Sequence, residues 1–292
     1  MPFAMIGFFL GMDTFSDYAV SVVPGWHTKV IPPLGANPLE TRVIVTKLIL
    51  VILCMIFARS SAMAFNRYLD RNFDAKNPRT ALREIPAGVL SASSTLWFTI
   101  ICSLLFMVCT AFINWLCFLL SPIALFVILG YSYTKRFTPL CHLILGLGLS
   151  LAPIGAYLAV TEHFDIIPVI FSFTVLTWVS GFDIIYALQD EEFDRSQKLY
   201  SIPAAVGKKN ALWISRTLHL SSVVFVVLAG LYGSFGWLYW AGVAFFAGML
   251  VYQHSIVKPN DLRRVNLAFM TANGIASVVF AIFVISDIFF HF

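Results

Sequence analysis

The feature that most constrains this chain is a series of apolar runs, each long enough to cross a lipid bilayer. A membrane helix needs about 20 predominantly apolar residues. Runs of that length predict helices near residues 43–65, 96–114, 116–133, 142–160, 166–189, 211–233, 236–256 and 265–290. The opening segment 1–11 is apolar but shorter, and it counts as a partial ninth. Because only 12% of the 292 residues are charged, a soluble domain is excluded, and we expect an all-α, polytopic membrane helical bundle.

Basic residues are concentrated in four of the connecting segments. Sixteen of the nineteen Lys and Arg residues lie within 59–91, 134–142, 190–216 and 254–264. Cytoplasmic loops of membrane proteins are enriched in these residues. We therefore expect all four segments on the cytoplasmic face, with 66–91 and 190–210 as cytoplasmic loops.

A polar stripe follows the first long apolar run. Asn66, Asp70 and Asp74 are spaced four residues apart, which on a helix places them within about 80° of arc. Such a stripe of oxygen ligands suits a hard cation. Taken alone, it is equally well explained as a helix end wetted by the cytoplasm.

A second stripe lies further along the chain. Asp183, Tyr186, Asp190 and Asp194 have spacings that return the three carboxylates to within about 40° of arc. Asp183 lies several residues inside an apolar run, where a carboxylate is costly and usually functional. Two such stripes on one predicted face favour a functional site over wetted helix ends.

Basic side chains accompany the acidic stripes. Arg71 directly follows Asp70, and Tyr131 and Lys135 form a Tyr-x-x-x-Lys step beside Arg136. Carboxylates alone would repel a phosphate, but carboxylates that hold Mg²⁺, supplemented by Lys and Arg, make a site for a diphosphate. For Lys135 and Arg136 alone, a topological role is the stronger interpretation.

The loop after the first stripe carries Arg79, Thr80 and Arg83. These side chains could close over the site or hold a carboxylate of an acceptor substrate. A role at the lipid surface is an equally good explanation of the two arginines.

In combination, these motifs resemble the UbiA superfamily of intramembrane aromatic prenyltransferases. The resemblance covers nearly the whole chain from about residue 43. It rests on Asn66-x-x-x-Asp70-Arg71-x-x-Asp74, the segment 77–88, Tyr131-x-x-x-Lys135 and Asp183-x-x-Tyr186-x-x-x-Asp190-x-x-x-Asp194. Within the superfamily, the residues of these motifs are most similar to those of the 4-hydroxybenzoate polyprenyltransferase group, including its relatives in the futalosine route to menaquinone. Protoheme farnesyltransferases share the first motif but less of the remainder.

The resemblance implies a single domain over 1–292, with about nine helices around a central cavity and an active site at its cytoplasmic end. It implies that Asn66, Asp70 and Asp74 hold one Mg²⁺ and that Asp190 and Asp194 hold another. Arg71 and Lys135 would bind the remaining oxygens of a polyprenyl diphosphate. Asp183 would accept the proton of the aromatic acceptor, positioned by Tyr186, although a role for Asp183 in the metal site is weighted nearly equally.

The implied function is transfer of a polyprenyl group to 4-hydroxybenzoate or a hydroxynaphthoate in ubiquinone or menaquinone biosynthesis. The implied location is a bacterial inner membrane, with the lipid bilayer as a partner and no nucleic acid; the oligomeric state is open. Family members usually begin further upstream, which implies a truncated first helix or a misassigned start codon, and the predicted loop 12–42 is unusually long. The rival classes are an ion-coupled secondary transporter and a structural membrane subunit.

Other polar residues have weaker interpretations. We expect the five cysteines to pack in the bundle, because they lack metal-ligand spacing. His142, His219 and His254 are expected near the interface. Asn266 and Asn273 share a face and are expected to make hydrogen bonds between helices.

Overall fold

The computed structural model of the protein describes residues 1–21 and 38–290. Its helices, in chain order, are α1 (Pro2–Ser21), α2 (Pro38–Asp74), α3 (Ala92–Ile113), α4 (Trp115–Thr134), α5 (Cys141–Thr161), α6 (Ile166–Ala187), the 3-10 turn η1 (Leu188–Asp190), α7 (Glu191–Ser196), α8 (Ile202–Tyr232), α9 (Trp237–Ile256), the π-helical segment η2 (Leu267–Ala272) and α10 (Asn273–Phe290). These described ranges contain no β-strand, and the all-α prediction is confirmed.

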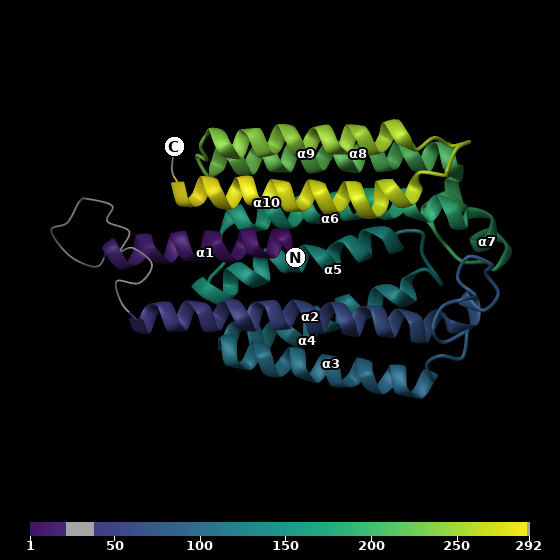
Figure 1. Cartoon of the computed structure of the whole chain (residues 1–292), viewed down its shortest axis with the longest axis horizontal. Helices are drawn as coiled ribbons and strands as arrows, with labels where there is room; N and C mark the ends of the chain where they lie inside the picture. Colours follow the sequence, from purple (N-terminus) through teal and green to yellow (C-terminus); the bar gives the residue numbers. More distant parts are fainter. Residues whose placement is uncertain (22–37, 291–292) are drawn as a thin grey trace.

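The long helices run back and forth along one axis of the molecule (Figure 1). Seven of the described helical segments are long and apolar enough to cross a membrane: Thr41–Asp74, Ala92–Ile113, Trp115–Thr134, Cys141–Thr161, Ile166–Ser196, Ile202–Tyr232 and Leu267–Phe290. Helix α9, with 20 residues, packs alongside α8 and α10. Each of the eight predicted spans therefore coincides with a long helix of the bundle.

Helix α1 extends beyond the apolar segment that we expected at residues 1–11. It continues to Ser21, although its apolar part, Pro2–Asp13, is shorter than a span. The predicted loop 12–42 is accordingly wrong at both ends, and its residues 22–37 lie outside the described residues. Helix α1 packs tightly on α5, because a Cβ atom at Gly7 would lie 2.0 Å from the carbonyl oxygen of Pro153.

Aromatic side chains and a few polar pairs hold the helices together. Phe3 of α1 packs against Trp178 and Phe280 in a buried cluster. The Nε1–H of Trp178 and the side-chain amide of Gln253 donate to Asn273 Oδ1, at 3.2 and 2.5 Å, which confirms the interhelical role expected of Asn273. All five cysteines are buried and unpaired, as predicted.

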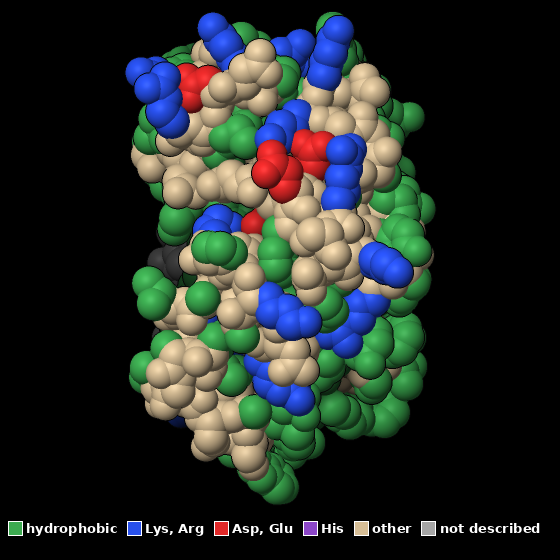
Figure 2. Space-filling model, turned by 90° about the vertical axis from the view of Figure 1, so that its right-hand side faces the viewer, with side chains coloured by type: hydrophobic (Ala, Val, Ile, Leu, Met, Phe, Trp, Pro, Cys, Tyr) green, Lys and Arg blue, Asp and Glu red, His purple; other side chains and the backbone are tan. Residues whose placement is uncertain are grey.

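One end of the bundle gathers the segments that carry the sequence motifs. The ends of α2, α4 and α6 and the starts of α5 and α8 lie at the right in Figure 1, together with α7 and the connection 75–91. Figure 2 shows Lys and Arg side chains spread over this end. Two predicted loops are partly helical: residues 66–74 belong to α2, and 190–210 contain α7 and the start of α8. The motifs are therefore held on packed helices.

Candidate active site

A cavity of about 220 Å³ opens at this basic end of the bundle. Residues of both acidic motifs line it, whereas Asp194 and Arg136 are not among its lining residues. The sequence-predicted residues on its wall are Asn66, Asp70, Asp74, Arg79, Thr80, Arg83, Tyr131, Lys135, Asp183, Tyr186 and Asp190. A larger and more open hollow of about 610 Å³ lies beside Lys258 and Asp261, but neither motif lines it.

The end of α2 supplies the carboxylates of the first motif. Asn66 Nδ2 donates to Asp70 Oδ2 at 3.1 Å, and Arg136 Nη2 donates to Asp70 Oδ1 at 3.4 Å. One turn later, Arg83 Nη1 donates to Asp74 Oδ1 at 2.7 Å. The spacing of four residues thus presents both carboxylates to one cavity, as the helical periodicity predicted.

The second motif approaches from α6, η1 and α7. Arg79 Nε donates to Asp190 Oδ1 at 3.0 Å and its Nη2 to Oδ2 at 2.5 Å, a bidentate ion pair. Asn77 Nδ2 adds a third hydrogen bond to Asp190, at 3.1 Å. Burial works to lower the pKa of Arg79, but the hydrogen bond and charge of Asp190 outweigh it, so this pKa lies above its ordinary value. The guanidinium also reaches the Tyr186 hydroxyl at 2.9 Å.

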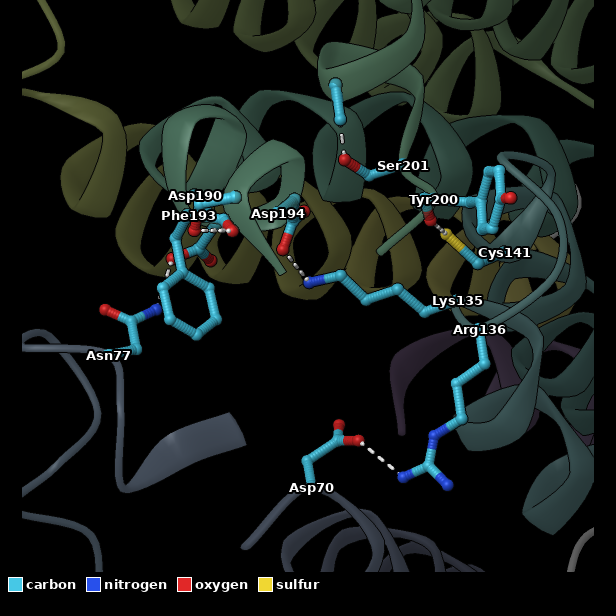
Figure 3. A network of polar contacts seen from close by, with 12 residues as sticks. Asp70, Asn77, Lys135, Arg136, Cys141, Asp190, Phe193, Asp194, Tyr200 and Ser201 are labelled. Atoms are coloured by element: carbon cyan, nitrogen blue, oxygen red, sulfur yellow. Dashed lines mark hydrogen bonds and ion pairs between the residues drawn. The ribbon is translucent and has the colours of Figure 1, made fainter. Parts of the chain in front are cut away.

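The carboxylate of Asp194 is fully buried and faces Lys135. Lys135 Nζ lies 2.7 Å from Asp194 Oδ1 (Figure 3). Burial lowers the pKa of Lys135, whereas the charge of Asp194 raises it. The net result is that the pKa of Lys135 lies above its ordinary value. Lys135 therefore supplies the counter-charge for a carboxylate that is buried from water.

Each of the four candidate metal-binding carboxylates thus has its own basic partner. The pairs are Asp70 with Arg136, Asp74 with Arg83, Asp190 with Arg79, and Asp194 with Lys135. In Figure 3, Asp70 lies across an open space from Asp190 and Asp194.

The side chains on this wall suit Mg²⁺ in their chemistry. In the described parts of the chain, no three or more Asp, Glu, His or Cys side chains are close enough to hold a metal ion by themselves. Mg²⁺ is usually held by one or two carboxylates, with substrate phosphates and water completing the shell. Asp74 Oδ2 is buried without a hydrogen bond, an unused oxygen ligand of the required kind. The residues therefore fit a metal that arrives with a phosphate substrate.

Asp183 lies on α6, about two helical turns before Asp190. Its Oδ2 is 2.7 Å from Nδ1 of His142, at the start of α5. The expectation that His142 lies at the interface is wrong, because the ring is buried and hydrogen-bonded inside the site. His219 is likewise buried, and its Nδ1 lies 2.9 Å from Nε2 of His254.

Two basic residues, Arg71 and Arg136, make contacts that differ from those expected from the sequence. Arg71 does not line the cavity; its Nη1 donates to the carbonyl oxygen of Tyr68 at 2.6 Å, and its guanidinium lies over the same residue's ring. Its contact with a diphosphate stays a prediction. Arg136, which sequence reasoning favoured as a topological signal, reaches Asp70.

Sequence reasoning also missed Asn77 and His142. The signal for Asn77 is its place in Asn77-Pro78-Arg79, where its side-chain oxygen accepts the backbone N–H of Arg79 at 3.0 Å. His142 carries no comparable signal, because its partner lies on another helix.

The fold and cavity define this protein as a membrane-embedded helical bundle of the UbiA fold. The fold is similar to the apo structure of a UbiA homolog from Aeropyrum pernix K1, with a TM-score of 0.76 and 24% identity over 99% of this chain and 97% of that one. It is also similar to a UbiA homolog from Archaeoglobus fulgidus bound to DMAPP and Mg²⁺, with a TM-score of 0.67 and 17% identity over 98% and 96% of the two chains.

The chain belongs to the UbiA prenyltransferase family, whose model matches residues 35–275, and it is accordingly a transferase. It is 28% identical over 263 residues to a 4-hydroxybenzoate octaprenyltransferase of Francisella tularensis subsp. mediasiatica, covering 90% of this chain and 91% of the relative. A protein of the same name from Nitrosospira multiformis is 27% identical over 234 residues, or 80% of each chain. The resemblance inferred from the motifs is confirmed, and the transporter alternative is set aside.

Proposed function

We propose that this protein transfers a polyprenyl group from a polyprenyl diphosphate to an aromatic hydroxy acid, 4-hydroxybenzoate or a hydroxynaphthoate, in ubiquinone or menaquinone biosynthesis. The observation that carries the proposal is the pair of acidic motifs facing one cavity, each carboxylate with a basic side chain beside it. The names of the curated relatives support 4-hydroxybenzoate as the acceptor.

In this proposal, Asn66, Asp70 and Asp74 hold one Mg²⁺, and Asp190 and Asp194 hold a second. When bound, Mg²⁺ neutralises charge that develops on the departing diphosphate. The solved homologue with DMAPP and Mg²⁺ supports metal dependence. The four basic partners would then turn from the carboxylates to oxygens of the diphosphate, since Lys and Arg are good phosphate ligands.

The chemical step breaks the bond between the allylic carbon and the diphosphate oxygen and forms a bond from that carbon to the acceptor ring. A ring proton must then leave to restore aromaticity. We assign the acceptance of this proton to Asp183, and its place on the cavity wall, deeper along α6 than Asp190, supports that role. Tyr186 lies beside it, with its ring stacked 4.2 Å from that of Phe269.

Arg79, Thr80 and Arg83 are proposed to close the cavity from the connection 75–91. Thr80 Oγ1 donates to the carbonyl oxygen of Asp74 at 3.2 Å, which ties this connection to the end of α2. Once the diphosphate is bound, Arg79 or Arg83 would form an ion pair with the carboxylate of an aromatic acid. The basic residues at this end of the bundle support a cytoplasmic location of the site in a bacterial inner membrane.

The test is to incubate membranes that contain the protein with labelled polyprenyl diphosphate, Mg²⁺ and each acid in turn. A prenylated 4-hydroxybenzoate or hydroxynaphthoate is the expected product, and membranes with the Asp190→Asn variant serve as the control. Diphosphate release without any prenylated acid would contradict the proposed acceptor class.

A further inference from the structure

His142 joins three segments of the site. It lies in the first turn of α5, its ring contacts Asp183 of α6, and it also receives a hydrogen bond from the start of α8. The side chain is 5% exposed, so protein atoms rather than water decide its hydrogen bonding.

The hydrogen bonds assign the ring proton. The backbone N–H of Ile202 donates to Nε2 of His142 at 3.4 Å. A peptide N–H can only donate, so Nε2 must present its lone pair and the proton of the neutral ring resides on Nδ1. That proton points at Asp183 Oδ2, 2.7 Å away. Ile202 is the first residue of α8, where a backbone N–H has no partner within its own helix.

Neighbouring contacts hold this arrangement in place. Ser180 Oγ donates to the backbone oxygen of His142 at 3.1 Å. Helices α5 and α6 approach so closely here that a Cβ atom at Gly146 would lie 2.3 Å from Ser180 Oγ. On the other side, the backbone N–H of Tyr200 donates to the carbonyl oxygen of Lys135 at 2.7 Å, which fixes the chain just before Ile202.

One carboxylate oxygen of Asp183 is hydrogen-bonded to His142, and the other is left to accept a proton. Within the described part of the chain, Oδ1 makes no hydrogen bond, and Asp183 lines the cavity with a side chain that is 21% exposed. A donor on one oxygen fixes the plane of the carboxylate and so sets the direction of the other oxygen.

We propose that His142 is a positioning residue that donates its Nδ1 proton to Asp183 Oδ2 and thereby turns Asp183 Oδ1 towards the acceptor ring. This proposal rests on the proposed function in so far as Asp183 accepts the ring proton. Through Ile202, the orientation of Asp183 also depends on the segment that follows the second acidic motif. A supporting residue of this kind typically contributes about 10- to 100-fold to activity.

The test compares two amide substitutions of similar polarity. In His142→Asn the side-chain amide occupies the position of Nδ1 and can still donate to Asp183, whereas in His142→Gln it reaches the position of Nε2. We expect single-turnover product formation to fall by about 10- to 100-fold in the Gln variant and to be largely retained in the Asn variant. The affinity for polyprenyl diphosphate should be unchanged in both. His219→Gln, at a buried histidine outside the cavity, is the control and should keep the wild-type rate.

A second measurement is independent of activity. In protein labelled with ¹⁵N-histidine, the signal lost in His142→Asn should have the shifts of a neutral ring protonated on Nδ1. Equal rates in the Asn and Gln variants, a parallel loss of donor affinity, or a ring protonated on Nε2 would each overturn the proposal. If the wild-type protein prenylates neither acid, the proposed function fails, while the ¹⁵N spectrum still decides whether His142 donates to Asp183.

Discussion

The ion pair between Lys135 and Asp194 provides a sharp test of how this site is stabilised before substrate binds. The two partners differ in burial, because the side chain of Asp194 is 0% exposed and that of Lys135 is 33% exposed. Lys135→Met leaves a buried carboxylate without a counter-charge, which costs about 3–5 kcal/mol. Asp194→Asn leaves an ammonium group that can turn towards water, and we expect a cost of only about 1 kcal/mol.

The measurement is the free energy of unfolding in mixed micelles, without metal and near pH 7, followed by the fluorescence of the seven tryptophans. In the double variant, the cost should be smaller than that of Lys135→Met alone, because the buried charge is gone. Millimolar Mg²⁺ should recover part of the stability of Lys135→Met, since a cation can replace the ammonium group.

Lys208→Met is the matched control. Lys208 lies 3.8 Å from Glu191, which keeps a second ion pair with Arg195 at 3.0 Å. It also lies 3.7 Å from Glu192, whose side chain is 92% exposed to solvent, so no buried carboxylate is left alone. The expected cost is below about 1 kcal/mol. Equal destabilisation by Lys135→Met and Asp194→Asn, or the reverse order, would refute the reasoning from burial.

Three further outcomes are expected. Asp70→Ala and Asp190→Ala should each abolish turnover while the protein remains inserted, and full activity of the wild type in EDTA would rule out a metal-dependent site. Cysteines introduced at Lys76 and Lys209 should react with an impermeant thiol reagent from the same side of the membrane; labelling from opposite sides would contradict the topology. Asp183→Asn should keep donor affinity while single-turnover product formation falls by about 10²- to 10⁴-fold, and a parallel loss of affinity would assign Asp183 to the metal site.

The sequence predicts this protein best where geometry is set within one helix. Asp70 and Asp74 face the same cavity because four residues make about one helical turn, and that relation needs no knowledge of the neighbouring helices. The apolar runs located the long helices for a similar reason, since bilayer thickness fixes their length.

Contacts between helices were predicted less well. Nothing in the sequence pairs His142 with Asp183, 41 residues away, because the approach of α5 to α6 decides that contact. For the same reason Arg136, rather than Arg71, reaches Asp70: adjacency in the chain sends Arg71 to a different face of the helix from its neighbour.

The one-to-one pairing of acidic and basic side chains offsets the charge of the four carboxylates that we propose as metal ligands. These four carboxylates and four cations cancel each other, and Asp183, hydrogen-bonded to His142, is the remaining carboxyl group on the cavity wall. The pairing thus limits the net charge held close to the bilayer, where charge is costly. A diphosphate that enters with divalent cations brings opposing charges of nearly equal size, and the total changes little. In the proposed function, each carboxylate would regain its own counter-ion from the protein once the diphosphate has left. The side chains of the site would then restore its starting charge without ions drawn from the solvent.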